Sequence, residues 1–135
     1  MKQSWFSFVK LGSLAGVVAA VINAALFFVG SYTGAIPSNL IIPNAGQPLT
    51  IVPVLVSSFL PAVVAGLLLD LLNRFTKRPL RIFTIIVLAI LAFSFISPFS
   101  IPGIPITMIV ILKLMHMVVV GAVLLAFNRF VNREG

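Results

Sequence analysis

The chain has no cysteine, a single histidine and only two acidic residues among its 135 positions. A disulfide scaffold is therefore excluded, and one histidine without cysteine makes a poor metal site, so we expect no metal and no cofactor. Charged residues make up only 8% of the chain, against about 25% in typical soluble domains. Hydrophobic residues make up 61%, more than so short a chain can bury within itself. These proportions exclude a soluble monomer and a disordered chain, and they indicate an integral membrane protein.

The uncharged stretches predict the number of membrane spans. No charged residue lies between Lys10 and Asp70, or between Arg81 and Lys113. A helix crosses the hydrocarbon of a bilayer with about 20 apolar residues. The first stretch accommodates two such helices, separated by a segment, 30–48, that is rich in Gly, Ser, Asn and Pro. Prolines from position 98 to 105 end a third helix and begin a fourth. We expect helices over residues 9–29, 49–72, 80–96 and 105–127.

These helices predict an all-α membrane protein in which two helical hairpins form a single four-helix domain over residues 1–135. A β-barrel is disfavoured because its strands alternate over roughly ten residues, whereas the apolar runs here are continuous and longer. The basic start of the first helix also fits a signal peptide. Its apolar stretch exceeds the usual h-region of about 7–15 residues, so we expect a permanent anchor.

The basic residues predict the orientation of the helices. Eight of the nine fall at one side of the predicted topology: Lys2, Lys10, Arg74, Lys77, Arg78, Arg81, Arg129 and Arg133. Positive residues remain cytoplasmic during insertion, so both termini should be cytoplasmic. The cluster formed by Arg74, Lys77, Arg78 and Arg81 should also contact anionic lipid headgroups, with a specific lipid or partner site as the alternative. The net charge of +7 then requires no nucleic acid.

Two rows of small residues at four-residue spacing predict helix–helix contacts. The first row is Gly12, Gly16, Ala20 and Ala24, and the second is Ser58, Ala62, Gly66 and Asp70. Residues at this spacing share one helix face, and small side chains let helix backbones approach closely in a membrane. Packing within one chain is the simplest interpretation. A homo-oligomer, or a contact with another membrane protein, is the alternative.

Three polar residues are expected within the bilayer near its outer side. Lys113 and His116 lie three residues apart on the fourth helix, and Asn23 lies at a similar depth on the first. Ionisable groups inside a membrane are costly and indicate a functional site. If the first and fourth helices are neighbours, the three residues form one polar layer that could bind a ligand. The alternative is a lysine satisfied by carbonyls and water, beside a histidine that bonds another helix.

Two further features concern polar groups on or near the second helix. Asp70 should lie at the cytoplasmic interface and pair with a nearby base such as Arg74. Pro61 removes a backbone hydrogen bond inside this helix, and the carbonyl of Ser57 that it frees could face the polar layer. Asp70 cannot form a catalytic dyad with the other acid, Glu134, which lies next to the C-terminus. We therefore expect no enzyme activity.

Several segments together resemble a bacterial family of small four-helix membrane proteins of unknown function. They are Asn23, the loop segments Gly34-Ala-Ile-Pro and Pro43 to Thr50, the turn Arg78-Pro-Leu-Arg-Ile-Phe83, and Met115-His116. The resemblance covers nearly the whole chain and supports four spans. It draws attention to Asn23 and His116, but it implies no activity, substrate or cofactor.

The leading functional hypothesis is a non-enzymatic, multi-pass protein of the bacterial inner membrane. It would bind a small or lipidic molecule in an outward-opening cavity lined by Asn23, Lys113 and His116. One alternative is a structural or accessory subunit that associates with itself or with another membrane protein. Another is an oligomeric channel or transporter, since four helices are few for a pore within one chain.

Overall fold

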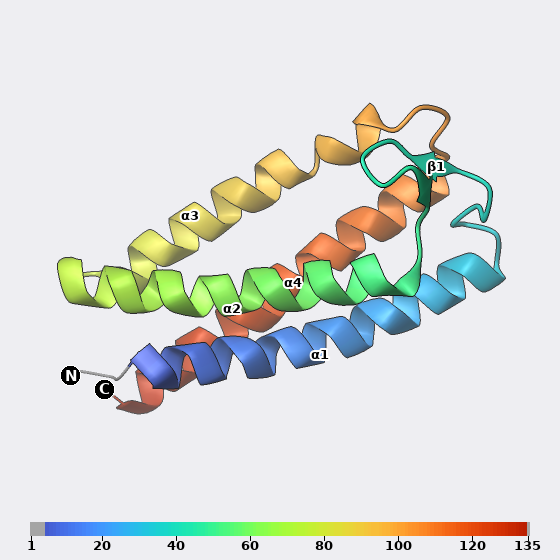
Figure 1. Ribbon diagram of the computed structural model, residues 1–135. Coiled ribbons are helices and arrows are strands. Elements are labelled where there is room, and N and C mark those ends of the chain that lie inside the picture. The colour runs from blue at the N-terminus through green and yellow to red at the C-terminus, as the bar shows by residue number, and fades with distance from the viewer. Residues whose placement is uncertain (1–4, 135) are drawn as a thin grey trace.

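The computed structural model describes residues 5–134 and consists mainly of four long α-helices (Figure 1). In chain order these are α1 (Trp5–Tyr32), α2 (Ile51–Phe75), α3 (Pro79–Ser94) and α4 (Ile106–Glu134), with a short 3-10 helix, η1 (Ser97–Ser100), between the last two. Each of the four is long and apolar enough to cross a membrane, the third together with η1. The prediction of an all-α membrane fold with four spans is confirmed.

The helix bounds differ from the expected ones mainly where a helix continues beyond its apolar part. α1 begins before residue 9, and α4 continues past residue 127 to Glu134. Lys, Arg and Asn are compatible with a helix in water, so a helix can continue beyond the apolar residues that cross the membrane. The length of the apolar stretch therefore predicts the membrane span and not the full helix. α3 instead begins at Pro79, where the fixed φ of proline suits the first turn.

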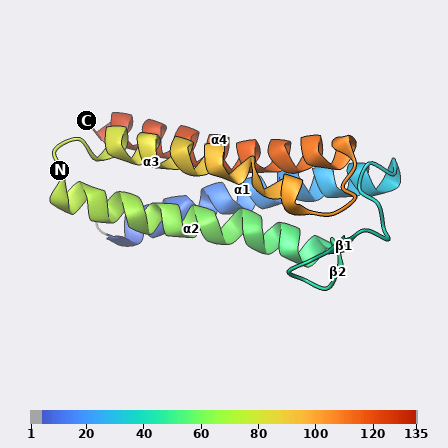
Figure 2. The ribbon, with the colours of Figure 1, turned by 90° about the horizontal axis from the view of Figure 1, so that it is seen from above.

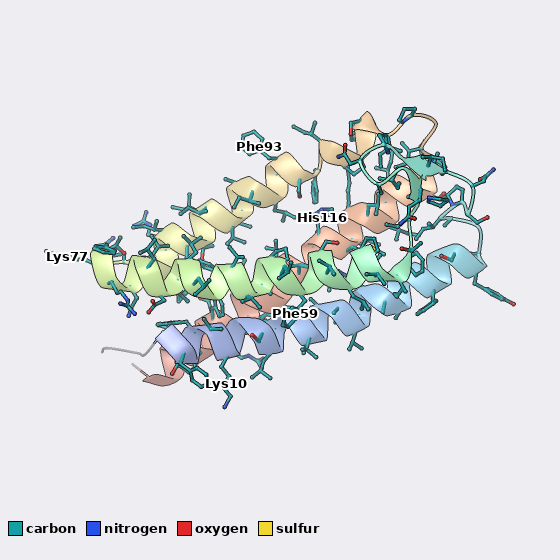
Figure 3. All side chains as sticks on the ribbon, viewed as in Figure 1. Lys10, Phe59, Lys77, Phe93 and His116 are labelled. Carbon is teal, nitrogen blue, oxygen red and sulfur yellow. The ribbon has the colours of Figure 1, made fainter. Side chains whose placement is uncertain are left out.

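The helices form two hairpins that pack into a bundle (Figure 2). α1 packs along α2 and against α4, while α3 packs against α2 and α4. The beginning of α1, the connection from α2 to α3 and the end of α4 share one end of the bundle (Figure 1). We call this the basic end, because Lys10 and Lys77 lie there (Figure 3). The other end, which carries residues 33–50 and 97–105, is called the hairpin end.

The two rows of small residues meet each other at the interface between α1 and α2. A Cβ atom added to Gly12 would lie 2.4 Å from the carbonyl oxygen of Ala62, and one added to Gly66 would lie 2.4 Å from that of Phe8. Side chains do not fit at such distances, so both positions require glycine. The predicted packing within one chain is confirmed, and the face of α1 that bears Gly12 and Gly16 is occupied by α2.

Aromatic side chains fill the core at the basic end. Phe8, Phe83 and Phe127 are at least 98% buried, and each comes from a different helix. The ring centroids of Phe83 and Phe127 are 5.3 Å apart. Leu69 of α2 joins the same cluster. All four helices therefore converge at this end of the bundle.

The hairpin end is closed by the connection between α1 and α2. Two short antiparallel strands, β1 (Ile41–Ile42) and β2 (Gln47–Pro48), form a small hairpin that the all-α prediction did not include. Just before it, the Ile36 side chain is 4% exposed and packs in a cluster with Phe27. The connection thus inserts an apolar side chain into the end of the bundle.

Candidate functional site

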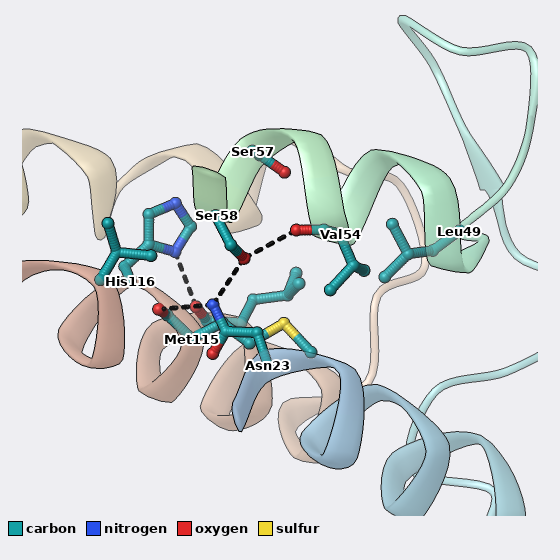
Figure 4. A pocket seen from close by; sticks show the side chains of 9 residues that line it. Asn23, Leu49, Val54, Ser57, Ser58, Met115 and His116 are labelled. Atoms are coloured by element: carbon teal, nitrogen blue, oxygen red, sulfur yellow. Dashed lines mark hydrogen bonds between the residues drawn. The ribbon is translucent and has the colours of Figure 1, made fainter. Parts of the chain in front are cut away.

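Two polar side chains are buried to the same extent in the hairpin half of the bundle, Asn23 of α1 and Ser58 of α2. Asn23 is the larger of the two. Asn23 is 2% exposed and lies where α1, α2 and α4 meet (Figure 4). Its Nδ2 atom donates one hydrogen bond to Ser58 Oγ of α2, at 2.8 Å. A second goes to the backbone carbonyl of Met115 in α4, at 3.2 Å. Asn23 therefore connects α1 to α2 and to α4 by hydrogen bonds. The first and fourth helices are neighbours, which is the condition for Asn23 to lie near residues of α4.

The bonds around Asn23 fix the direction of its amide. The hydroxyl of Ser58 donates to the carbonyl of Val54 at 2.7 Å, so Ser58 Oγ accepts from Asn23. The Met115 carbonyl can only accept. Both N–H groups of the Asn23 amide are thereby used. The amide atom that faces Ser58 and Met115 must be the nitrogen, so the other is the oxygen, Oδ1. Among the described residues this buried oxygen has no hydrogen-bond partner. A buried acceptor without a donor costs about 1–3 kcal/mol.

Asn23 lines a small pocket between α1, α2 and α4 that holds about 90 Å³. One water molecule needs about 10–15 Å³ on this measure, so the pocket holds several waters or a small polar group. Its lining residues are Asn23, Leu49, Val54, Ser57, Ser58, Leu112, Met115, His116 and Val119. Ser57 and His116 are exposed at the surface of the bundle, while Asn23 and Ser58 are buried. The pocket therefore runs from an accessible rim to a buried polar floor.

His116 is held in one orientation at the rim. Its Nδ1 atom lies 2.6 Å from the carbonyl oxygen of Leu112, one turn earlier in α4. A carbonyl only accepts, so Nδ1 carries the proton in this contact. In the neutral imidazole, Nε2 is then an acceptor. Figure 4 shows the His116 ring beside Ser58 of α2.

Lys113 does not join the pocket, although it lies only three residues before His116. Its Nζ atom lies 4.7 Å from the ring centroid of Phe99 in η1 and 5.5 Å from that of Phe95, which follows α3. Three residues along a helix correspond to roughly 60° around its axis, enough to direct Lys113 toward η1 and the residue that follows α3. The structure thus brings Asn23 and His116 into one pocket and places Lys113 in a separate aromatic contact.

Asp70 and Arg74 lie at the basic end, away from this pocket. Arg74 Nη2 is 3.0 Å from Asp70 Oδ2, across one turn of α2. The Asp70 carboxylate is largely buried, and its Oδ1 has no partner among the described residues. The Arg74 side chain is 55% exposed, so solvent weakens the pair. This contact orients Asp70 at the end of the α1–α2 interface.

Sequence reasoning missed the role of Ser58. The four-residue spacing places it in a row of small packing residues, but its hydroxyl also accepts a hydrogen bond from the Asn23 amide. A serine in an interhelical row at the depth of a buried asparagine is the available signal, since polar side chains bond across helices in membranes. Over residues 5–134, no three metal-ligating side chains gather at one place.

A family model covers almost all of this architecture. The model of a family of unknown function, DUF6069, matches residues 5–133, which include the pocket residues and all of the four helices except the last residue of α4. The chain belongs to this family. The resemblance expected from the short segments is thus confirmed, and DUF6069 membership brings no assigned activity. No curated protein and no solved structure matches this DUF6069 chain.

Proposed function

We propose that this DUF6069 protein is a non-enzymatic, multi-pass protein of the bacterial inner membrane that binds a small molecule in the Asn23 pocket. The hairpin end would face outward and the basic end the cytoplasm. This orientation follows from the bias of basic residues to cytoplasmic loops. Arg74, Lys77, Arg78 and Arg81 would then lie among anionic headgroups, which adds to the retention of that end at the inner surface.

The observation that carries the proposal is the pocket itself, in which Ser57, Ser58 and His116 surround the buried Asn23 side chain. Apolar side chains alone could pack three helices at this point, whereas the chain places four polar side chains around unfilled volume. A bound small polar molecule accounts for both the polar lining and the volume.

The chemistry of the lining favours binding over catalysis. Its polar side chains are one amide, two hydroxyls and one imidazole, and no carboxylate accompanies them. Proton transfer needs an acid and a base at hydrogen-bonding distance from the reacting group. The Asn23 pocket instead offers fixed acceptors within apolar walls, an arrangement that orients a ligand without activating it.

Native mass spectrometry of the protein released from nanodiscs tests this function. We expect the wild type to carry a small-molecule adduct and Asn23→Leu to lose it, since leucine keeps the volume but removes the amide. Val21→Leu, which changes an exposed side chain on α1, is the matched control and should keep the adduct. An identical adduct pattern in wild type and Asn23→Leu, or none in either, contradicts the proposal.

A further inference from the structure

Lys113 is the only charged side chain in the hairpin half of the described bundle. Along α4 the next charged residue is Arg129, roughly 24 Å further on at 1.5 Å per residue. Of the two acids in the chain, Asp70 pairs with Arg74 towards the basic end, and Glu134 is the last residue of α4. No carboxylate of the described residues therefore lies close enough to neutralise the ammonium group of Lys113.

The ammonium group lies at the end of the membrane-spanning part of the bundle. Its Nζ atom is 4.7 Å from the ring centroid of Phe99, which is the last residue but one of the span Pro79–Ser100. A side chain on α4 also tilts towards the N-terminus of that helix, which is at the hairpin end. A lysine in this position brings its charge to the depth at which hydrocarbon meets the lipid headgroups.

Two aromatic rings hold the ammonium group without neutralising it. The rings belong to Phe99 and to Phe95, whose centroid is 5.5 Å from Nζ. The face of a benzene ring attracts a cation through its quadrupole, but the ring carries no net charge. Lys113 is only partly buried, and Phe99 is 62% exposed. The ammonium group is therefore fixed in position and remains open towards the surroundings of the bundle.

An apolar surface continues from Lys113 along the same face of α4. Val110 lies three residues before Lys113 and Met117 four residues after it, so the three side chains share one helix face. Val110 is 49% exposed and Met117 is 51% exposed. Met117 lies one turn deeper in the membrane than Lys113. The surface thus offers a cation at headgroup depth and apolar contact beneath it.

We infer that Lys113 and Phe99 form a site for an anionic phospholipid in the leaflet at the hairpin end. The phosphate oxygens accept hydrogen bonds from the Lys113 ammonium group, and an acyl chain lies along Met117. Charge complementarity selects a head with a net negative charge, because a zwitterionic head carries its own cation, which competes with Lys113 for the phosphate. This site is separate from the Asn23 pocket and does not depend on the function proposed for that pocket.

Photo-crosslinking in nanodiscs tests the site with three lipid probes that have identical acyl chains. Each carries a diazirine near the start of one chain, and the heads are phosphatidylglycerol, phosphatidylcholine and the free hydroxyl of diacylglycerol. We expect the phosphatidylglycerol probe to label residues 106–117 roughly fivefold more than either of the others. This ratio corresponds to about 1 kcal/mol for one lysine at an anionic headgroup.

Three variants assign the excess labelling to Lys113. Lys113→Leu should reduce labelling of residues 106–117 by the phosphatidylglycerol probe to the level of the diacylglycerol probe. Lys113→Arg keeps the charge and should keep the excess. Lys77→Leu, the matched control, removes a cation at the basic end and should leave the labelling of residues 106–117 unchanged. Labelling of residues 71–82 in the same samples reports that each variant is folded and inserted.

The outcomes separate a lipid site from its competitors. Equal labelling of residues 106–117 by the three probes in the wild type means that water alone solvates Lys113, and it overturns the inference. An excess that persists in Lys113→Leu overturns it as well, because the charge is then not the determinant. If inorganic phosphate at millimolar concentration removes the excess, the site binds small anions and not a phospholipid, which also contradicts the inference.

Discussion

The two ends of the bundle are built in different ways. At the basic end, backbones touch through Gly12 and Gly66, and the rings of Phe8, Phe83 and Phe127 are buried among four helices. Towards the hairpin end, α3 diverges from α2, as Figure 1 shows, and the space beside α2 and α4 is a crevice with a polar floor. Packing that fills space stabilises a membrane protein, while unfilled space lined by polar side chains serves recognition. We therefore assign stability to the basic end and binding to the hairpin half.

The strongest test of this comparison is Gly66→Leu. The new side chain must displace the backbone of α1, because even a Cβ atom would lie 2.4 Å from the Phe8 carbonyl oxygen. We expect destabilisation of about 3 kcal/mol or more, measured by reversible unfolding in mixed micelles. Gly121→Leu is the control, since nothing lies within 4 Å of a Cβ atom there. Equal losses in the two variants would contradict the assigned packing.

Phe83→Ala probes the aromatic core at the same end. The Phe83 side chain is fully buried against Phe127, so its removal leaves a cavity, and we expect a loss of about 3 kcal/mol in the free energy of unfolding. Phe93→Ala removes the same group from a position on α3 that is 75% exposed and should change stability by less than about 0.5 kcal/mol. Similar losses would mean that the basic end is not the stable half.

The smallest expected effect concerns the contact of Lys113 with Phe99. Lys113→Leu should change the free energy of unfolding by about 1 kcal/mol or less, because the lost cation–π contact is offset by the removal of a charge from the bilayer. Amide exchange in η1 should nevertheless become faster. Lys113→Arg preserves the contact and should exchange like the wild type. If the arginine variant behaves like the leucine variant, the contact does not hold η1.

Much of this fold follows from local features of the sequence, but less of the site does. Uncharged length marks the four spans, and four-residue rows of small residues mark the interface of α1 with α2. Depth along a helix correctly placed Asn23 beside α4. Depth alone does not determine the rotation of α4, so it could not show that His116 faces the pocket while Lys113 faces Phe99.

The missing information is tertiary in origin. The direction of the Asn23 amide depends on Ser58, a residue far away in sequence. The insertion of Ile36 depends on the space that the end of the bundle provides. Both require the rotation of each helix and its distance from its neighbours, which weakly periodic apolar helices do not encode locally.

The central claim is that Asn23 is present for a ligand rather than for stability. It is tested most directly by measuring the free energy of unfolding and the adduct occupancy on the same preparation of Asn23→Leu. Leucine removes two hydrogen bonds and one unsatisfied acceptor together, so we predict stability within about 1 kcal/mol of the wild type, with the adduct gone. A loss of several kcal/mol with the adduct retained would contradict the claim.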